Sequence, residues 1–142
     1  MKKSIWTTIP DLEYLNGSFR ENTMLEALGL EIVEFTDDSI IATIPVDKNT
    51  MQPFGLLHGG ATATLAETLG SLGSQFVLPD PEKGRVVGIA LNINHLNSAK
   101  SGVVTGVVTP VKLGGRLHVW QIDITREDGK PVSRARLTVM VL

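Results

Sequence analysis

One helix-forming stretch constrains the fold of this chain more than any other part of its sequence. Apolar side chains recur there at spacings of four, three and four residues: Leu65, Leu69, Leu72 and Phe76. Such spacing is typical of one apolar helical face. Glu67 is the only charged side chain within residues 59–78, whereas a surface helix carries several charges on its outer face. The sequence therefore predicts a long central helix over residues 58–78 that is buried nearly all round.

The segments on either side of this helix predict strands. Two runs rich in β-branched residues flank the turn-forming pair Asp37 and Asp38 and predict a hairpin: residues 30–35 and 39–46. Four later runs, separated by glycine and polar turns, predict an antiparallel meander: residues 85–96, 102–111, 117–126 and 132–142. Residues 1–29 predict short covering helices. Together these elements indicate an α+β fold with the sheet wrapped around the helix, and self-association that covers the strand edges.

The composition limits the number of domains and the kinds of partner. With 142 residues, 42% of them apolar, the chain fits a single domain over residues 1–142. Its 15 acidic and 13 basic residues are interspersed, so no block of like charge predicts binding to nucleic acid or to a membrane surface. The chain has no cysteine, no signal-peptide core and no uncharged window as long as a membrane span. We therefore expect a cytoplasmic protein with a small-molecule partner.

Glu67 lies in a stripe of small and polar side chains on the helix face opposite the leucines. A carboxylate buried there without a positive partner would have a raised pKa. Perturbed carboxylates occur at catalytic sites and also in structural networks. From the residues alone, Glu67 is therefore a functional group, or it pairs with an arginine across a subunit interface, or its stripe simply meets solvent at an edge.

The start of the predicted helix offers a chemical partner for this carboxylate. At His58, Gly59 and Gly60, backbone N–H groups lack intrahelical acceptors and the helix dipole adds partial positive charge. Glycine also lets a substrate carbonyl approach the backbone, as an oxyanion hole for acyl transfer requires. An ordinary glycine-rich helix start is the alternative, and a structural role is the more frequent one for a histidine such as His58.

Other common catalytic motifs are missing from the sequence. The segment GSLGS at residues 70–74 has the wrong order for a GxSxG nucleophile elbow and falls inside the predicted helix. The three histidines, His58, His95 and His118, form no HxH or HExxH grouping, so we expect no metal site. Neither a P-loop nor a GxGxxG fingerprint is present, and we expect no cofactor.

The segment QPFGLLHGGATATLAETLGS at residues 52–71 resembles the hotdog-fold thioesterases of the PaaI-like superfamily. The resemblance lies in a glutamine, an HGG triplet and a glutamate nine residues past the histidine. It runs from about residue 30 to residue 142 and includes residues 86–99 and 119–122. It is closest to the branch that hydrolyses 1,4-dihydroxy-2-naphthoyl-CoA in menaquinone synthesis. The resemblance implies a hotdog fold and an acyl-CoA thioesterase whose only coenzyme is the CoA of its substrate.

Residue by residue, the resemblance implies five catalytic positions. Glu67 would act as nucleophile or as general base for water, and the amide of Gly59 would form the oxyanion hole. Gln52 and His58 would position the thioester carbonyl and the active-site loop. Ser71, one turn after Glu67, would assist the attacking water or carboxylate. Since a thiolate departs readily, one carboxylate and one oxyanion hole would suffice.

The resemblance also implies where CoA binds and how subunits assemble. Three regions would hold pantetheine and nucleotide: Gly88; His95, Leu96, Asn97 and Ser98; and Lys112, Leu113, Gly114, Gly115, Arg116 and Leu117. Lys112, Gly115 and Leu117 stand where close relatives carry histidine or serine. The active sites would be shared between the subunits of a homodimer, and dimers would pair into a homotetramer. One of three arginines would lie near the CoA phosphates: Arg126, Arg134 or Arg136.

Two other functions remain open from the sequence. One is a hotdog hydratase or dehydratase, which also places a histidine and a carboxylate near the central helix. The other is a non-catalytic acyl-CoA-binding module in which Glu67 is merely tolerated. The HGG triplet and Gln52 favour hydrolysis.

Overall fold

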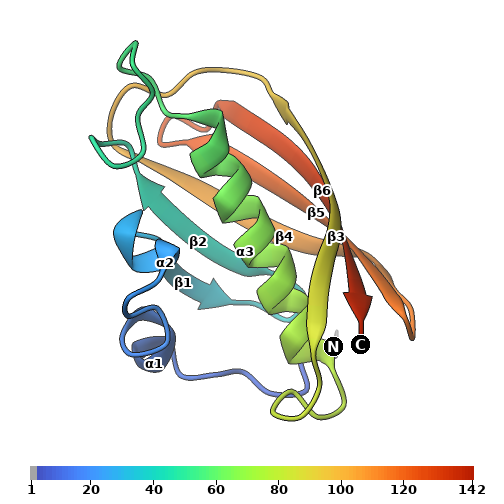
Figure 1. The fold of residues 1–142 in the computed structure, drawn as a ribbon. Helices are drawn as coiled ribbons and strands as arrows, with labels where there is room; N and C mark the ends of the chain where they lie inside the picture. Colours follow the sequence, from blue (N-terminus) through green and yellow to red (C-terminus); the bar gives the residue numbers. More distant parts are fainter. Residues whose placement is uncertain (1–2) are drawn as a thin grey trace.

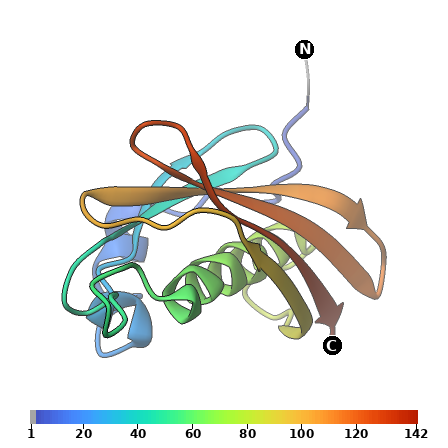
Figure 2. The same ribbon diagram turned by 90° about the horizontal axis from the view of Figure 1, so that it is seen from above.

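A six-stranded antiparallel sheet wraps around one long helix in the computed structural model, which describes residues 3–142 (Figures 1 and 2). The strand order is β1-β2-β4-β5-β6-β3. The elements in chain order are α1 (Leu12–Asn16), α2 (Met24–Ala27), β1 (Glu31–Phe35), β2 (Ile40–Pro45), α3 (Gly59–Val77), β3 (Val86–His95), β4 (Val103–Leu113), β5 (Leu117–Arg126) and β6 (Pro131–Val141). The predicted α+β fold is confirmed, and each predicted strand agrees with the structure to within two residues.

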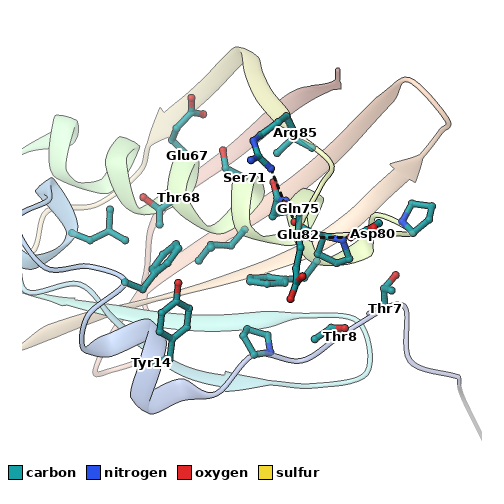
Figure 3. A pocket seen from close by; sticks show the side chains of 18 residues that line it. Thr7, Thr8, Tyr14, Glu67, Thr68, Ser71, Gln75, Asp80, Glu82 and Arg85 are labelled. Carbon is teal, nitrogen blue, oxygen red and sulfur yellow. Dashed lines mark hydrogen bonds between the residues drawn. The ribbon is translucent and has the colours of Figure 1, made fainter.

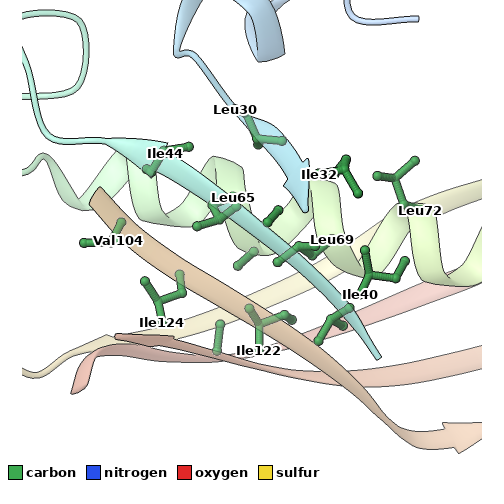
Figure 4. Close-up of a cluster of buried hydrophobic side chains, with 14 of the residues drawn as sticks. Leu30, Ile32, Ile40, Ile44, Leu65, Leu69, Leu72, Val104, Ile122 and Ile124 are labelled. Carbon is green, nitrogen blue, oxygen red and sulfur yellow. The ribbon is translucent and has the colours of Figure 1, made fainter. Parts of the chain in front are cut away.

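The inner face of α3 packs into the curved sheet and forms the core shown in Figure 4. Leu65 and Leu69 are fully buried against strand residues such as Ile122. Two glycines let the helix approach the sheet closely, because a Cβ at Gly70 would lie 2.4 Å from Leu137 and one at Gly73 would lie 2.9 Å from the ring of Trp120. The apolar helical face predicted from the leucine spacing is therefore the core face.

The prediction that the central helix is buried nearly all round is wrong for this chain. The sheet covers only one side of α3, so the opposite face is left partly open (Figure 2). Gly60 is exposed, and Glu67, Thr68 and Ser71 are half-buried. The small and polar stripe around Glu67 is this open face.

The N-terminal segment lies against β1 and the C-terminal half of α3 (Figure 1). Trp6 stacks on Trp120 with ring centroids 6.2 Å apart, and its indole N–H donates to the carbonyl of Thr36 at 2.6 Å. The amide of Thr7 donates to the carbonyl of Phe76 at 2.9 Å, at the end of α3. The predicted covering helices are present as α1 and α2, each about one turn long.

The edge strand β3 pairs with β6, and within the described residues its other edge has no partner strand. Its side chains are almost all exposed, including Val87, Ile89 and Leu91 at 41%, 50% and 36%. An unpaired edge strand with exposed apolar side chains is a site where another strand can add. Within residues 3–142, no helix combines the length and apolar character needed to cross a bilayer.

Candidate active site

A cavity of about 1240 Å³ lies over the open face of α3 (Figure 3). Glu67, Ser71 and Gln75 line it from α3, at successive helical turns. The N-terminal segment contributes Tyr14 and Phe19, and the loop before β3 closes the far end. The cavity is therefore built from one helix and two segments that are distant in sequence.

Glu67 is an isolated carboxylate at one side of this cavity. Its Oε2 atom is buried and has no hydrogen-bond partner among the described residues. Burial raises the pKa of Glu67 above its ordinary value. Gly88 of β3 makes room for it, since a Cβ there would lie 2.6 Å from Oε1. A carboxylate with free lone pairs and a raised pKa is suited to accept a proton or to attack an electrophile.

The N-terminus of α3 carries one free amide. The imidazole of His58 caps the helix, because its Nδ1 accepts a hydrogen bond from the amide of Gly60 at 2.7 Å. The amides of Ala61 and Thr62 donate to the carbonyl of His58. The amide of Gly59 has no acceptor within residues 3–142, so it is the donor left for a ligand.

A smaller cavity of about 320 Å³ lies at this helix terminus. Gln52, Gly59 and the residues 95–98 line it together. The imidazole of His95 lies directly over Gly59, where a Cβ would be 2.8 Å from its Nε2. Gln52 Oε1 accepts a hydrogen bond from the amide of Phe54, and within residues 3–142 its side-chain NH₂ group is left as a second donor.

The sequence-predicted residues thus form two groups, here named half-sites. The Gly59 half-site contains Gln52, His58, Gly59, His95, Leu96, Asn97 and Ser98. The Glu67 half-site contains Glu67, Ser71 and Gly88. Eight residues of helix separate Gly59 from Glu67, or about 12 Å along the axis. That separation is too large for one thioester carbonyl to contact both groups within one subunit.

The predicted CoA-binding turn at residues 112–117 lines neither cavity. It lies at the Glu67 end of the sheet, because Leu117 pairs with Met140, and Met140 pairs with Val87 of β3. His95 pairs with Ser133 at the other end of the same strand. The structure therefore does not bring this turn together with residues 95–98 in one chain.

A buried network holds this turn on the helix. Trp120 donates its indole N–H to Ser74 Oγ at 2.7 Å, and Ser74 Oγ lies 2.9 Å from Nδ1 of His118. Burial lowers the pKa of His118, and a hydrogen bond to the backbone of Gly114 acts in the opposite direction. Ser74 and His118 are fully or nearly fully buried, so this pair is structural.

The three arginines considered for CoA phosphates differ in their pairing. Arg126 pairs with Asp128, whose pKa this hydrogen bond helps to lower to about 2, and also donates to the carbonyl of Ser98. Arg134 pairs with Asp123 at 2.7 Å. Arg136 has no ion pair within residues 3–142.

Several cavity residues were missed by the sequence reasoning. Tyr14 and Phe19 precede the region of family resemblance and carry no motif, and Gln75 reads as an ordinary helix residue. Arg85 lines the far end beside Glu82 (Figure 3). Only the fold brings these side chains to Glu67. Among the described residues, no three His, Asp or Glu side chains cluster as a metal ion would require.

The sequence model of the Thioesterase superfamily matches residues 54–133, which include both Gly59 and Glu67. The chain belongs to this superfamily. It is 44% identical to the 1,4-dihydroxy-2-naphthoyl-CoA hydrolase of Escherichia coli, over 97% of this chain and 99% of that protein.

Solved structures of thioesterases share the fold of this superfamily member. Thioesterase HI1161 of Haemophilus influenzae is 46% identical with a TM-score of 0.92, over 97% of this chain and 94% of that one. A mutant of thioesterase PA1618 of Pseudomonas aeruginosa is 45% identical with a TM-score of 0.94, over 98% and 99% of the two chains. The hotdog fold and a thioesterase activity are thereby shown. The similarity also extends into the N-terminal segment, beyond the residues 30–142 that the motifs had indicated.

Proposed function

We propose that this thioesterase hydrolyses acyl-CoA, with an aromatic or other small acyl group, to the free acid and CoA. The observation that carries the proposal is the half-buried carboxylate of Glu67, whose buried Oε2 has no hydrogen-bond partner among the described residues, beside a cavity large enough for an acyl group. The naphthoyl-CoA hydrolase from E. coli supports an aromatic acyl group, and 1,4-dihydroxy-2-naphthoyl-CoA is a specific candidate. A cytoplasmic location, expected from the sequence, fits a substrate that carries CoA.

Each active site in this proposal is shared by two subunits of a homodimer. Glu67 lies beside Gly88, and Gly59 lies beside His95, on the same strand β3. Gly88 and His95 are equally distant from the midpoint between Leu91 and Asn92. Antiparallel pairing of two β3 edges about a two-fold axis at that midpoint would place the Glu67 half-site of one subunit against the Gly59 half-site of its partner.

The same pairing would bring the two CoA-binding regions together. The turn at residues 112–117 lies at the Glu67 end of one subunit, and residues 95–98 lie at the Gly59 end. In the dimer these regions would flank one thioester from opposite sides. The exposed Val87, Ile89 and Leu91 of β3 would then be covered. Pairing of dimers into a homotetramer is a further expectation.

The proposed reaction uses one proton acceptor and one oxyanion donor. The thioester carbonyl accepts a hydrogen bond from the Gly59 amide and from the side chain of Gln52. Glu67 takes a proton from water as the water oxygen bonds to the carbonyl carbon, and Ser71 holds that water. The tetrahedral intermediate collapses by breaking the C–S bond, and the CoA thiolate recovers the proton from Glu67. Direct attack by Glu67, through an anhydride that water then hydrolyses, is the alternative for the first step.

Replacing Glu67 tests the proposal. We expect Glu67→Gln to fold and bind acyl-CoA but to release CoA about 10³-fold more slowly, because only the reactive oxygen is lost. Thiol detection reports this reaction directly, since the chain has no cysteine. Glu34→Gln, an exposed carboxylate on β1, is the control and should keep full activity.

Three outcomes would contradict parts of this proposal. Undiminished turnover in Glu67→Gln would remove Glu67 from the reaction. Hydration of enoyl-CoA by the wild type, without CoA release, would indicate a hydratase. Binding of acyl-CoA with no turnover of any acyl group would indicate a binding module.

A further inference from the structure

Two aromatic side chains of the N-terminal segment face the cavity that contains Glu67. Tyr14 of α1 and Phe19 of the following turn form an edge-to-face pair, with centroids 5.6 Å apart and planes at 61°. Both line the cavity, and both are only partly covered by the chain, at 51% and 38% exposed. An aromatic pair that is left open beside a cavity presents ring faces and edges to whatever occupies it.

The pair is held in a fixed position by the residues around it. Leu15 is buried to 1% exposure and fixes α1 on the core. Asn16 makes two hydrogen bonds of 2.8 Å with the backbone of Ile32, one as donor and one as acceptor, as a neighbouring strand would. Arg20 donates to the carbonyl of Leu30 at 2.7 Å and closes the turn that carries Phe19. These anchors make the aromatic pair a preformed wall of the cavity.

The pair lies across the open face of α3 from Glu67. Figure 3 shows Glu67 on the side of the helix next to β3 and Tyr14 on the opposite side, with its hydroxyl pointing toward the helix. Thr68, Ser71 and Leu72 form the cavity wall between them. An acyl group whose carbonyl lies at Glu67 therefore crosses the helix face before it meets the aromatic rings, and a large group extends further toward them than an acetyl group does.

We propose that Tyr14 and Phe19 select the acyl group, favouring bulky aromatic acyl chains over short ones. This inference rests on the proposed thioesterase function, because it takes Glu67 as the point where the acyl group begins. A planar ring can pack against the edge-to-face pair, whereas a short aliphatic group leaves the rings exposed to water. The N-terminal segment thereby becomes the part of the chain that sets acyl specificity.

Binding measurements separate this inference from catalysis. We would use the Glu67→Gln background, in which the thioester stays intact, and measure the affinities of 2-naphthoyl-CoA and acetyl-CoA by calorimetry. Combining Tyr14→Leu with Phe19→Leu should weaken naphthoyl-CoA binding about tenfold. Acetyl-CoA binding should change less than about twofold, because the CoA contacts are unaltered.

Two further variants serve as controls. Tyr14→Phe keeps the ring pair and should keep the preference for naphthoyl-CoA. Met24→Leu, at an exposed residue of α2 outside the cavity lining, should bind both esters like the parent. The inference would be overturned if the double variant lost affinity equally for both esters, or lost affinity for neither. It would also be overturned if the parent bound both esters with the same affinity. Failure of the thioesterase proposal would show separately, as absence of CoA release by the wild type.

Discussion

The two half-sites differ in what each leaves unpaired. At the Gly59 half-site the polar groups are donors near the surface: the Gly59 amide at a helix N-terminus and the side-chain amide of Gln52. At the Glu67 half-site the unpaired group is an acceptor, a buried carboxylate oxygen without any donor among the described residues. The Gly59 half-site can therefore stabilise a developing negative charge, and the Glu67 half-site can take up a proton.

The difference explains why one chain holds an incomplete site. Acyl transfer needs both groups at one carbonyl, yet about 12 Å of helix separates them. Their neighbours on β3, Gly88 and His95, lie at equal distances from the midpoint between Leu91 and Asn92. A homodimer formed through β3 would therefore complete two sites at once, and each half-site can be disabled separately to test this.

The largest effect on the Gly59 half-site should come from removing its amide. Gly59→Pro deletes the N–H, and the backbone accepts proline there because Gly59 is the first residue of α3 and His58 is already extended, at φ −70° and ψ 132°. We expect kcat to fall about 10²–10³-fold, as when one oxyanion donor is lost.

Gly59→Ala is the matched control for that variant. It adds the same Cβ, which would lie 2.8 Å from Nε2 of His95 if neither residue moved, but it keeps the N–H. Its kcat should fall far less than that of Gly59→Pro. If both variants lose the same activity, crowding of His95 and not loss of the amide is the cause, and Gly59 is not the oxyanion donor.

A smaller effect should follow from moving the carboxylate without removing it. Gly88→Ala would place a Cβ 2.6 Å from Glu67 Oε1, so the carboxylate must shift. We expect kcat to fall about 10–100-fold, the range for a misplacement of about 1 Å. The adjacent Ile89→Ala, which leaves this contact intact, distinguishes the shift from a general change in β3. Full activity in Gly88→Ala would mean that the position of Glu67 next to β3 does not matter.

The smallest effect concerns stability and its dependence on pH. The folded chain raises the pKa of Glu67, so folding is favoured while the group is protonated and this contribution is lost as pH rises through the folded pKa. Glu67→Gln should therefore melt roughly 2–4 °C higher than the wild type at pH 7. The difference should shrink below the ordinary pKa of 4.5. If Glu67→Gln melts no higher than the wild type at pH 7, or if the gain in melting temperature is the same at pH 7 and below pH 4.5, the charge of Glu67 is not buried without a partner.

Much of the fold was predictable because its signals are local. The leucine spacing fixed the inner face of α3, and the β-branched runs between turns indicated the strands. The scarcity of charge on the helix could not distinguish a buried face from one that borders a cavity, which is why burial of α3 nearly all round was predicted wrongly. Both environments exclude charged side chains, and only the three-dimensional curvature of the sheet decides between them.

The candidate site was predictable in part for the same reason. Gln52, His58, Gly59 and Glu67 fall in one continuous segment, so their spacing was visible. The sequence could not show that Gly59 and Glu67 face different cavities, because that depends on where β3 passes the start and the middle of the helix. Tyr14 and Phe19 gave no signal, since they lie some fifty residues from Glu67 in the chain, and sharing a cavity across that separation leaves no periodicity to detect.

Mixing two inactive variants tests the shared site most directly. Glu67→Gln and Gly59→Pro would be purified separately, allowed to exchange subunits, and assayed for CoA release. A mixed dimer holds one site with both substitutions and one with neither, so the mixture should recover about a quarter of wild-type activity. If exchange is verified by mass spectrometry and activity stays at the level of the separate variants, Glu67 and Gly59 do not act across a dimer.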